Sequence, residues 1–218
     1  MIDLHTHTIF SDGQLIPSEL VRYAAVTDYR AIAITDHGDH SNLDFIIPRI
    51  VSVCHVLADA HRLTVIPGIE LTFVPPEHID RLAKKARELG AKVVVVHGET
   101  IVEPVPPGTN RAALEAAIDI LAHPGLITPD EAALAAERGI CLEITTRRGH
   151  SLANGHVARQ AREHGASLVL NTDTHLCDDL VTDATARMIA AGAGLTDAET
   201  AVMFANSERL VERITRAG

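Results

Sequence analysis

Asp3-Leu4-His5-Thr6-His7 is the stretch from which the rest of the chain can be interpreted, because a short apolar run here ends in two histidines. Side chains alternate along an extended segment, so His5 and His7 lie on one side and can bind the same metal ion. A single His-x-His pair is weak evidence by itself. It gains weight because later apolar runs in the chain also end in His, Asp or Glu.

Seven apolar runs predict strands that alternate with helices. The strands are expected at residues 1–5, 31–35, 64–70, 93–96, 118–122, 140–144 and 168–170. Several follow a charged helix end and a glycine, as Arg87-Glu88-Leu89-Gly90 precedes the valines at 93–96. This alternation is typical of parallel βαβ units and therefore predicts an α/β fold.

The helices have recognisable ends. They are expected at residues 17–28 and 43–61 and, towards the C-terminus, at about 179–191, 197–204 and 207–214. Capping boxes, in which Thr and Glu side chains satisfy free backbone N–H groups, start helices at 128–131 and 196–199. Pro67 lies in a predicted strand and indicates a bulge or a strand end, because proline cannot donate to a ladder.

The strand ends decide between an open sheet and a barrel. An open sheet places its ligand at a topological switch point that few loops serve. A closed barrel brings the carboxyl ends of all strands to one face. Since every predicted strand but the sixth ends in a candidate ligand, we expect residues 1–218 to form one barrel domain. The Pro-rich loop 99–110 follows His97 and is expected to be a rim or lid of the site.

Composition excludes several classes of protein. The chain is 46% hydrophobic but only 3% aromatic, which favours a core of buried parallel strands. Its formal net charge of -10 argues against a basic face for long nucleic acid. The cysteines, Cys54, Cys141 and Cys177, are odd in number and predict no disulfide framework. With no signal peptide and no apolar run near the ~20 residues of a membrane span, we expect a cytoplasmic protein without a membrane partner.

The strand ends supply nine candidate metal ligands. They are His5, His7, Asp12, His37, Glu70, His97, His123, Asp173 and His175. Each alone is more often a turn, capping or core residue, but together they would bury many unpaired polar groups, which is costly. A metal cluster removes that cost for all of them. Histidine and carboxylate ligands without cysteine suit Zn, Mn or Fe(II), and nine exceed the needs of one ion. Two or three divalent ions are therefore expected, with Glu70 as a bridge.

Read in order, these residues form motifs that resemble the PHP (polymerase and histidinol phosphatase) family over about residues 1–177. The motifs are His5-Thr6-His7, Ser11-Asp12-Gly13, Thr35-Asp36-His37-Gly38, Glu70, His97-Gly98-Glu99, Ala122-His123-Pro124-Gly125 and Thr172-Asp173-Thr174-His175. The resemblance implies a distorted seven-stranded (β/α)7, TIM-like barrel with a trinuclear centre. Many relatives have His where Asp12 stands, although Asp is also seen in the family.

The resemblance also implies which residues hold each ion. One ion would take His5, His7, Glu70 and Asp173. A second would take Glu70, His97 and His123, and a third would take Asp12, His37 and His175.

The ligand set and the resemblance predict a metal-dependent phosphoesterase. We expect a phosphatase for a small phosphorylated metabolite or nucleotide, with a phosphodiester also open, in which metal-bound hydroxide attacks phosphorus. Glu70, Asp173 and His97 would act through the metal, and His150 or His156 would be the general acid.

The end of the sixth strand carries a different signal, Arg147-Arg148, which two solvated loop charges would also explain. Both arginines are predicted to bind substrate phosphate, because a guanidinium binds two oxygens at once. Glu143, on the same strand, is expected either to point into the barrel or to lie under the cluster.

Two other functions compete with this hypothesis. An amidohydrolase that cleaves C–N or ester bonds would usually carry a carboxylated lysine on a strand, but Lys84, Lys85 and Lys92 are not at strand ends. A non-catalytic, metal-stabilised accessory module is disfavoured because the ligand set is complete and no polymerase is attached. The sequence does not choose the substrate or the oligomeric state.

Overall fold

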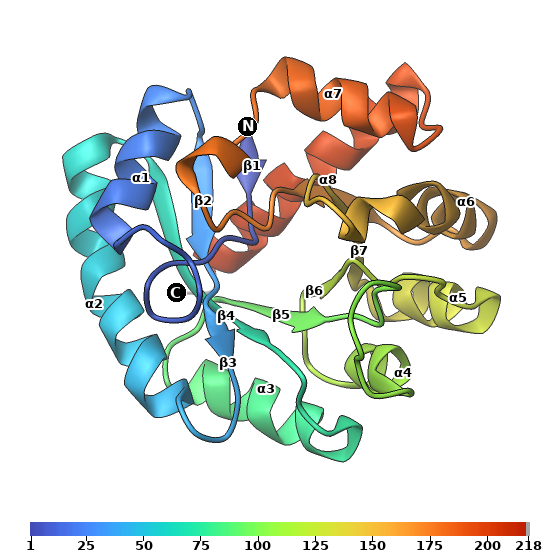
Figure 1. Ribbon diagram of the computed structural model, residues 1–218, viewed down its shortest axis with the longest axis horizontal. Coiled ribbons are helices and arrows are strands. Elements are labelled where there is room, and N and C mark those ends of the chain that lie inside the picture. The colour runs from blue at the N-terminus through green and yellow to red at the C-terminus, as the bar shows by residue number, and fades with distance from the viewer. Residues whose placement is uncertain (217–218) are drawn as a thin grey trace.

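The computed structural model describes residues 1–216 and shows a nearly closed barrel of parallel strands surrounded by helices (Figure 1). The strands along the barrel are β1 (Ile2–Asp3), β2 (Ala31–Ile34), β4 (Thr64–Leu71), β5 (Val93–His97), β6 (Ile120–Ala122), β7 (Cys141–Thr145) and β8 (Leu168–Asn171). The short strand β3 (His37–Gly38) continues β2 along β4, since Ile34 pairs with Pro67 and His37 with Glu70. The predicted seven-stranded barrel is confirmed.

The helices cover the outside of the barrel. They are α1 (Pro17–Val26), α2 (Leu43–His61), α3 (Ile79–Glu88), α4 (Thr109–Glu115), α5 (Pro129–Arg138), α6 (Asn154–His164), α7 (Asp183–Gly192) and α8 (Asp197–Arg216). Three short 3-10 turns lie between them, η1 (Pro76–His78), η2 (His150–Ala153) and η3 (Cys177–Asp179). Both predicted capping boxes form, at Thr128 with Glu131 and at Thr196 with Glu199.

The first and last strands close the barrel just beyond their assigned ends. Thr6 and Thr174 form a parallel bridge, and His7 N–H donates to Thr174 O at 2.8 Å. Asp173 N–H donates to His5 O at 3.0 Å. These bonds bring the candidate ligands at the two ends of the predicted set side by side, which an open sheet would not do.

The valines of β5 show how the core is divided. Val93 and Val95 belong to the cluster that fills the barrel, whereas Val94 and Val96 pack against the surrounding helices. This alternation makes the whole run buried, as expected for parallel strands covered on both faces. Most of the candidate ligands are therefore found at the strand ends, where loops replace the neighbouring apolar layers.

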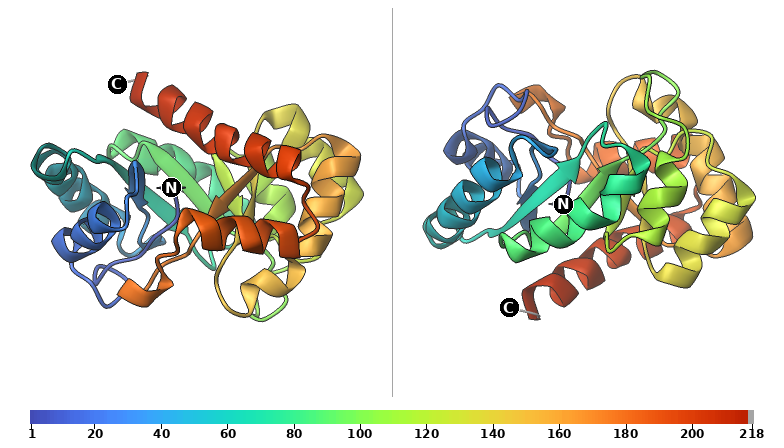
Figure 2. Two further views of the ribbon diagram at one scale, coloured as in Figure 1. Left: turned by 90° about the horizontal axis from the view of Figure 1, so that it is seen from above. Right: turned by 90° about the horizontal axis from the view of Figure 1, so that it is seen from below.

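Helix α8 covers the amino-terminal end of the barrel (Figure 2). Its Leu210 and Ile214 pack into the cluster that fills the barrel, and Arg213 donates to the buried carboxylate of Asp119 at 2.9 Å. Two helices were predicted here, at 197–204 and 207–214, and that prediction is wrong. Instead, one helix continues through Asn206. The buried side chain of Asn206 donates to Leu168 O at 2.8 Å and so connects the middle of α8 to β8.

Pro67 lies inside β4 rather than at a strand end. It is followed in the ladder by Gly68, which pairs with Val93, the first residue of β5. The proline carbonyl accepts from Lys92 N–H at 2.8 Å. The missing N–H therefore falls where β5 has not yet begun, and no ladder bond is lost.

Within residues 1–216, no helix combines the length and the apolar character that crossing a membrane requires.

Candidate metal centre

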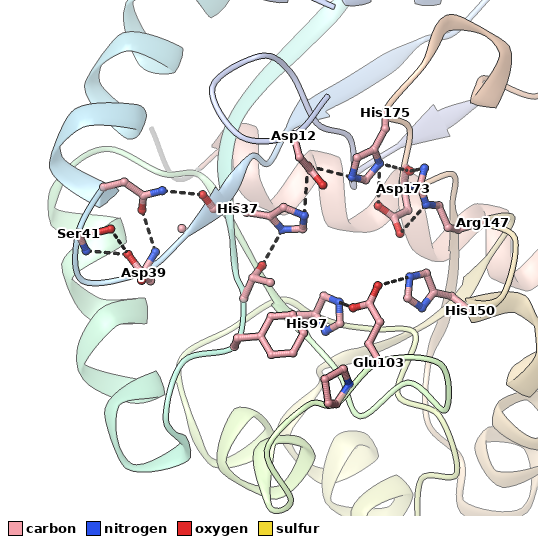
Figure 3. Close-up of a pocket in the computed structure, with 15 residues that line it drawn as sticks. Asp12, His37, Asp39, Ser41, His97, Glu103, Arg147, His150, Asp173 and His175 are labelled. Atoms are coloured by element: carbon pink, nitrogen blue, oxygen red, sulfur yellow. Dashed lines mark hydrogen bonds and ion pairs between the residues drawn. The ribbon is translucent and has the colours of Figure 1, made fainter. Parts of the chain in front are cut away.

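The carboxyl ends of the strands surround a cavity of about 580 Å³ (Figure 3). The site side chains among its lining residues are Asp12, His37, His97, Glu103, Arg147, His150, Asp173 and His175. The remaining predicted ligands, His5, His7, Glu70 and His123, lie buried beneath them. The structure thus brings all nine predicted ligands to one place.

The floor of the cavity is formed by predicted ligands from the first, third and last of the seven predicted strands. His5 Nε2 lies 3.3 Å from Glu70 Oε1, and His7 Nε2 lies 3.1 Å from Asp173 Oδ1. Glu70 is fully buried and also lies 2.6 Å from His37 Nδ1 and 3.8 Å from His123 Nε2. It occupies the centre of the group, as a bridging carboxylate would.

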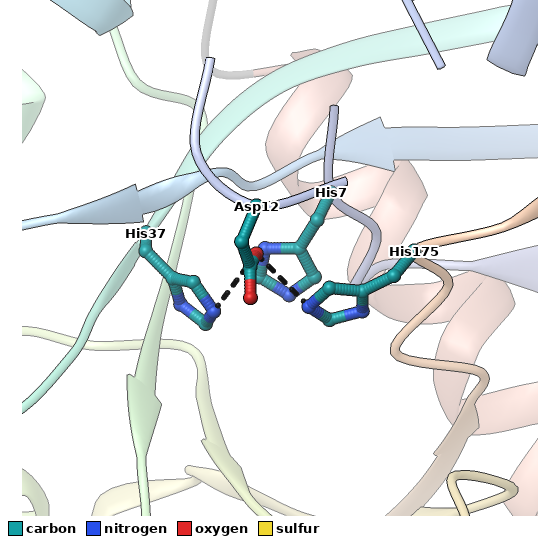
Figure 4. A group of neighbouring side chains, drawn as sticks. All are labelled: His7, Asp12, His37 and His175. Atoms are coloured by element: carbon teal, nitrogen blue, oxygen red, sulfur yellow. Dashed lines mark ion pairs between the residues drawn. The ribbon is translucent and has the colours of Figure 1, made fainter. Parts of the chain in front are cut away.

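A second group of ligands lies beside the floor, around Asp12 (Figure 4). Asp12 Oδ1 is 3.3 Å from His37 Nε2 and 3.0 Å from His175 Nε2. The His7 ring lies between them, with its centroid 4.2 Å from that of His37 and 4.3 Å from that of His175. His7 is therefore shared between this group and the floor.

A third group contains three imidazoles, one more than the strand ends predict. The rings of His97 and His123 are 4.5 Å apart, and those of His123 and His150 are stacked at 4.2 Å. Each of the three can offer a nitrogen within 4.8 Å of the others. His150 comes from the turn η2, outside any strand.

Several ligand atoms in this centre are buried without a hydrogen-bond partner. They are His5 Nε2, both ring nitrogens of His7, Glu70 Oε1 and His123 Nδ1. A buried polar group left unpaired costs about 1–3 kcal/mol. Coordination to divalent ions would satisfy the atoms that face the cavity floor. These residues, with mixed imidazole and carboxylate donors, therefore fit the predicted ions.

Burial and neighbouring charges set opposite protonation tendencies within the centre. Burial lowers the pKa values of His7 and His123, which favours the neutral imidazoles that bind metals. Burial raises the pKa of Asp173 to about 7. Burial alone would lower the pKa of His5, but Glu143, Glu70 and Asp173 raise it well above its usual value. A metal ion held by His5 and Asp173 would therefore compete with protons for these side chains.

A layer of hydrogen bonds beneath the ligands fixes their orientation. Glu143 Oε2 lies 2.9 Å from His5 Nδ1 and accepts from Asn171 Nδ2 at 2.8 Å, which confirms that Glu143 lies under the cluster. Asp36 accepts from Thr8 N–H at 2.7 Å and from Ser11 Oγ at 2.7 Å, and so shapes the turn that carries Asp12. Asp36 is thus a structural residue rather than a ligand.

Two of the predicted ligands have backbones in the left-handed region. His123 has φ of 27° and Asp173 has φ of 54°. Residues other than glycine rarely adopt this conformation, and it costs about 1–3 kcal/mol at each position. Strain of this kind clusters at functional sites, where the surrounding structure holds it in place.

The two predicted phosphate-binding arginines differ in position. Arg147 lines the cavity, with Nη1 donating to Asp179 Oδ2 at 3.2 Å and to Asp173 O at 3.3 Å. Arg148 is exposed and is not among the lining residues, so the structure does not bring it to the site.

The histidines whose roles the sequence left open also differ in their positions relative to the cavity. His156 lies away from the cavity, where its Nε2 is 2.7 Å from Ile127 O, whereas His150 lines the cavity. His40 is exposed at the rim beside His78, with their ring nitrogens 3.0 Å apart.

A carboxylate beside the candidate ligand His97 was not predicted. Glu103, on the Pro-rich loop, contacts His97 with Oε2 at 3.0 Å from Nε2. The sequence marked this loop as a rim or lid, but it offered no signal that singles out Glu103.

Comparisons with known proteins agree with this geometry. A family model described as PHP domain matches residues 3–127. An uncharacterized protein of Methanocaldococcus jannaschii is 51% identical over 199 residues, which cover 90% of this chain and 91% of that protein. A probable phosphatase of Shewanella sp. strain MR-4 is 29% identical over 208 residues, covering 82% of this chain and 78% of that protein.

Among solved structures, this chain resembles a histidinol phosphate phosphatase from Lactococcus lactis that was crystallised with zinc, L-histidinol and phosphate. The TM-score is 0.63 at 17% sequence identity, covering 89% of this chain and 94% of that one. A likeness at this level of identity supports the barrel fold.

Proposed function

The chain belongs to the PHP domain family, and on this premise we propose that it is a metal-dependent phosphoesterase for a small phosphorylated metabolite or nucleotide. The observation that carries the proposal is the convergence of nine imidazole and carboxylate ligands on one cavity that also contains Arg147. The cavity volume of about 580 Å³ is in the range of small-molecule sites, which favours a compact substrate.

We propose two or three divalent ions, of Zn, Mn or Fe, as the cofactors. His5, His7, Glu70 and Asp173 would hold one ion, Glu70 with His97 and His123 a second, and Asp12 with His37 and His175 a third. When bound, such ions make a nucleophile from water near neutral pH and neutralise charge on a phosphoryl group. Glu70 lies centrally enough to join the first two sites, because His5 and His123 approach the same oxygen, Oε1, at 3.3 and 3.8 Å.

Arg147 is proposed to orient the substrate phosphate. Its Nη1 is held by Asp179 and by the carbonyl of Asp173, which leaves Nη2 for a phosphoryl oxygen. A guanidinium fixed in this way stabilises the extra negative charge of the transition state without having to reorganise.

His150 is the predicted proton donor to the leaving oxygen. Thr100 Oγ1 lies 2.7 Å from His150 Nδ1, and His150 lines the cavity. As a proton donor His150 would be doubly protonated: its Nδ1–H would donate to Thr100 Oγ1, and its Nε2–H, 3.5 Å from the Glu103 carboxylate at the cavity wall, would be the proton that is transferred.

Arg147→Ala is expected to lower kcat/KM by about 10²–10³-fold while leaving the metal content unchanged, since Arg147 binds phosphate rather than metal. Arg148→Ala provides a matched control, and its kcat/KM should remain near the wild-type value because Arg148 is exposed outside the cavity. Steady-state kinetics with elemental analysis of both variants checks this. A larger loss in Arg148→Ala would reverse the assignment.

The proposed function is tested by a panel of phosphomonoesters and phosphodiesters assayed with metal-loaded and chelator-treated protein. We expect phosphate release from at least one compact monoester, and its loss on chelation. Protein that holds two or more ions but cleaves no phosphoester would refute the proposal. Cleavage of amides or carboxylic esters in its place would favour the amidohydrolase alternative, and loss of stability alone in His97→Ala would favour the accessory module.

A further inference from the structure

The Pro-rich loop between β5 and α4 places a carboxylate in the cavity. Glu103 Oε2 lies 3.0 Å from His97 Nε2, and Oε1 lies 3.5 Å from His150 Nε2 (Figure 3). The rest of the loop is largely exposed, whereas His97 and His150 are buried. Glu103 is therefore the carboxylate that the loop places beside the candidate ligand His97.

The base of the loop is firmly closed. Glu99 Oε1 accepts from the N–H groups of Gly108 at 3.0 Å and Asn110 at 2.9 Å. The Asn110 side chain is buried, accepts from Glu99 N–H at 2.9 Å and donates to Pro124 O at 2.9 Å. The loop that carries Glu103 is thus anchored to the residue that follows the ligand His123.

Close backbone packing strengthens this anchor. Gly125 has φ of 59°, and a Cβ added there would lie 1.9 Å from Glu99 O. The segment after His123 therefore has to approach the loop base without a side chain. This packing couples the position of Glu103 to that of His123.

The neighbouring rings present the correct atoms to Glu103. His97 Nδ1 lies 3.2 Å from Gly98 O, to which it can donate, so its Nε2 is left for the cavity. His150 is held at Nδ1 by Thr100, which turns its Nε2 towards Glu103. Fixing one ring nitrogen by a backbone or side-chain partner is how proteins direct the other nitrogen of a histidine at a metal ion.

We propose that Glu103 is a further ligand of the ion held by His97 and His123, with His150 positioning the carboxylate. Ligand atoms about 2.0–2.2 Å from a shared ion lie roughly 3–3.5 Å from one another, which matches the contact of Glu103 with His97. Neither the strand-end pattern nor the family motifs includes Glu103. The inference rests on the metal centre of the proposed function, and it makes metal binding the event that fastens the loop over the cavity.

Metal titration of Glu103→Gln tests this ligand directly. Metal-free protein is titrated with Zn²⁺ in a calorimeter, and bound zinc is counted by elemental analysis. We expect the affinity for one ion to fall by more than about 100-fold, beyond the 10–100-fold that loss of a group orienting a ligand costs, with the others unchanged. Glu77→Gln, which replaces an exposed glutamate of η1, is the matched control and should bind like wild type.

Hydrogen exchange supplies a second measurement that a purely catalytic role would not change. Zn²⁺ should protect the backbone amides of residues 99–108 in wild type and protect them less in Glu103→Gln. If Glu103 only pairs with protonated His97 or orients a ligand, every zinc affinity would stay within about 100-fold of wild type and the protection would remain intact, and that result would overturn the proposal.

The binding measurements contain no substrate, so they separate this inference from the proposed function. Suppose that wild-type protein binds zinc but hydrolyses no phosphoester, and that Glu103→Gln binds one zinc ion more weakly. This result would refute the proposed function and support Glu103 as a metal ligand. If the wild-type enzyme is active and Glu103→Gln retains wild-type zinc affinity, the proposed function is supported and the assignment of Glu103 as a ligand is refuted.

Discussion

Glu70→Gln should remove two of the bound ions and lower kcat/KM by at least about 10³-fold, because the metal charge in such a centre contributes several kcal/mol to the transition state. Glu70 belongs to two of the proposed ion sites and contacts His5, His37 and His123 at 3.3, 2.6 and 3.8 Å. Glutamine has nearly the same shape but lacks the charge, so the packing around the buried side chain is preserved.

Elemental analysis and steady-state kinetics of purified Glu70→Gln check this prediction. Glu115→Gln, which changes an exposed glutamate paired with Arg111, is the control for a general loss of negative charge. A Glu70→Gln variant with its full complement of ions and activity within about 10-fold of wild type would show that Glu70 is not the bridge.

His5→Ala is the second change with a large expected effect. It should remove one ion and most of the activity, yet leave the ion at His97 and His123 partly in place. His5 contacts Glu70 and Asp173 on one side and Glu143 on the other, whereas His97 and His123 approach the centre from β5 and β6. Removing His5 therefore opens one side of the centre.

The loss of His5 also affects the folded state, so stability is measured alongside metal content. Glu143 would keep Asn171 as a partner but lose the imidazole, and a buried carboxylate with fewer partners lowers the free energy of unfolding. His55→Ala, on the exposed face of α2, is the control and should change neither quantity. If His5→Ala retained every ion, the assignment of His5 as a ligand would be wrong.

The barrel, and the residues that meet at one of its faces, could be predicted from the sequence because both depend on short-range patterns. Buried parallel strands appear as continuous apolar runs, and the residue that ends each run lies at the same face of the barrel. His97 after four valines and Glu70 after Ile69 are examples. Their meeting follows from closure of the barrel between Thr6 and Thr174.

The remaining features depend on contacts between distant residues. Glu103 lies beside His97 because hydrogen bonds between Glu99 and Asn110 close the base of the loop. No periodic pattern in the sequence predicts these hydrogen bonds. Arg147 and Arg148 are adjacent and chemically identical, but only the conformation of the loop places one in the cavity. Helix α8 continues through Asn206 because that side chain bonds to β8, a contact 38 residues away.

Anomalous diffraction from crystals of the metal-loaded protein with phosphate tests the central claim most directly, because it locates the ions and the anion together. We predict two or three peaks among the nine ligands, one of them beside Glu70, and a phosphate between the ions and Arg147. A single peak outside this cluster, or no peak near Glu70, would contradict the shared metal centre.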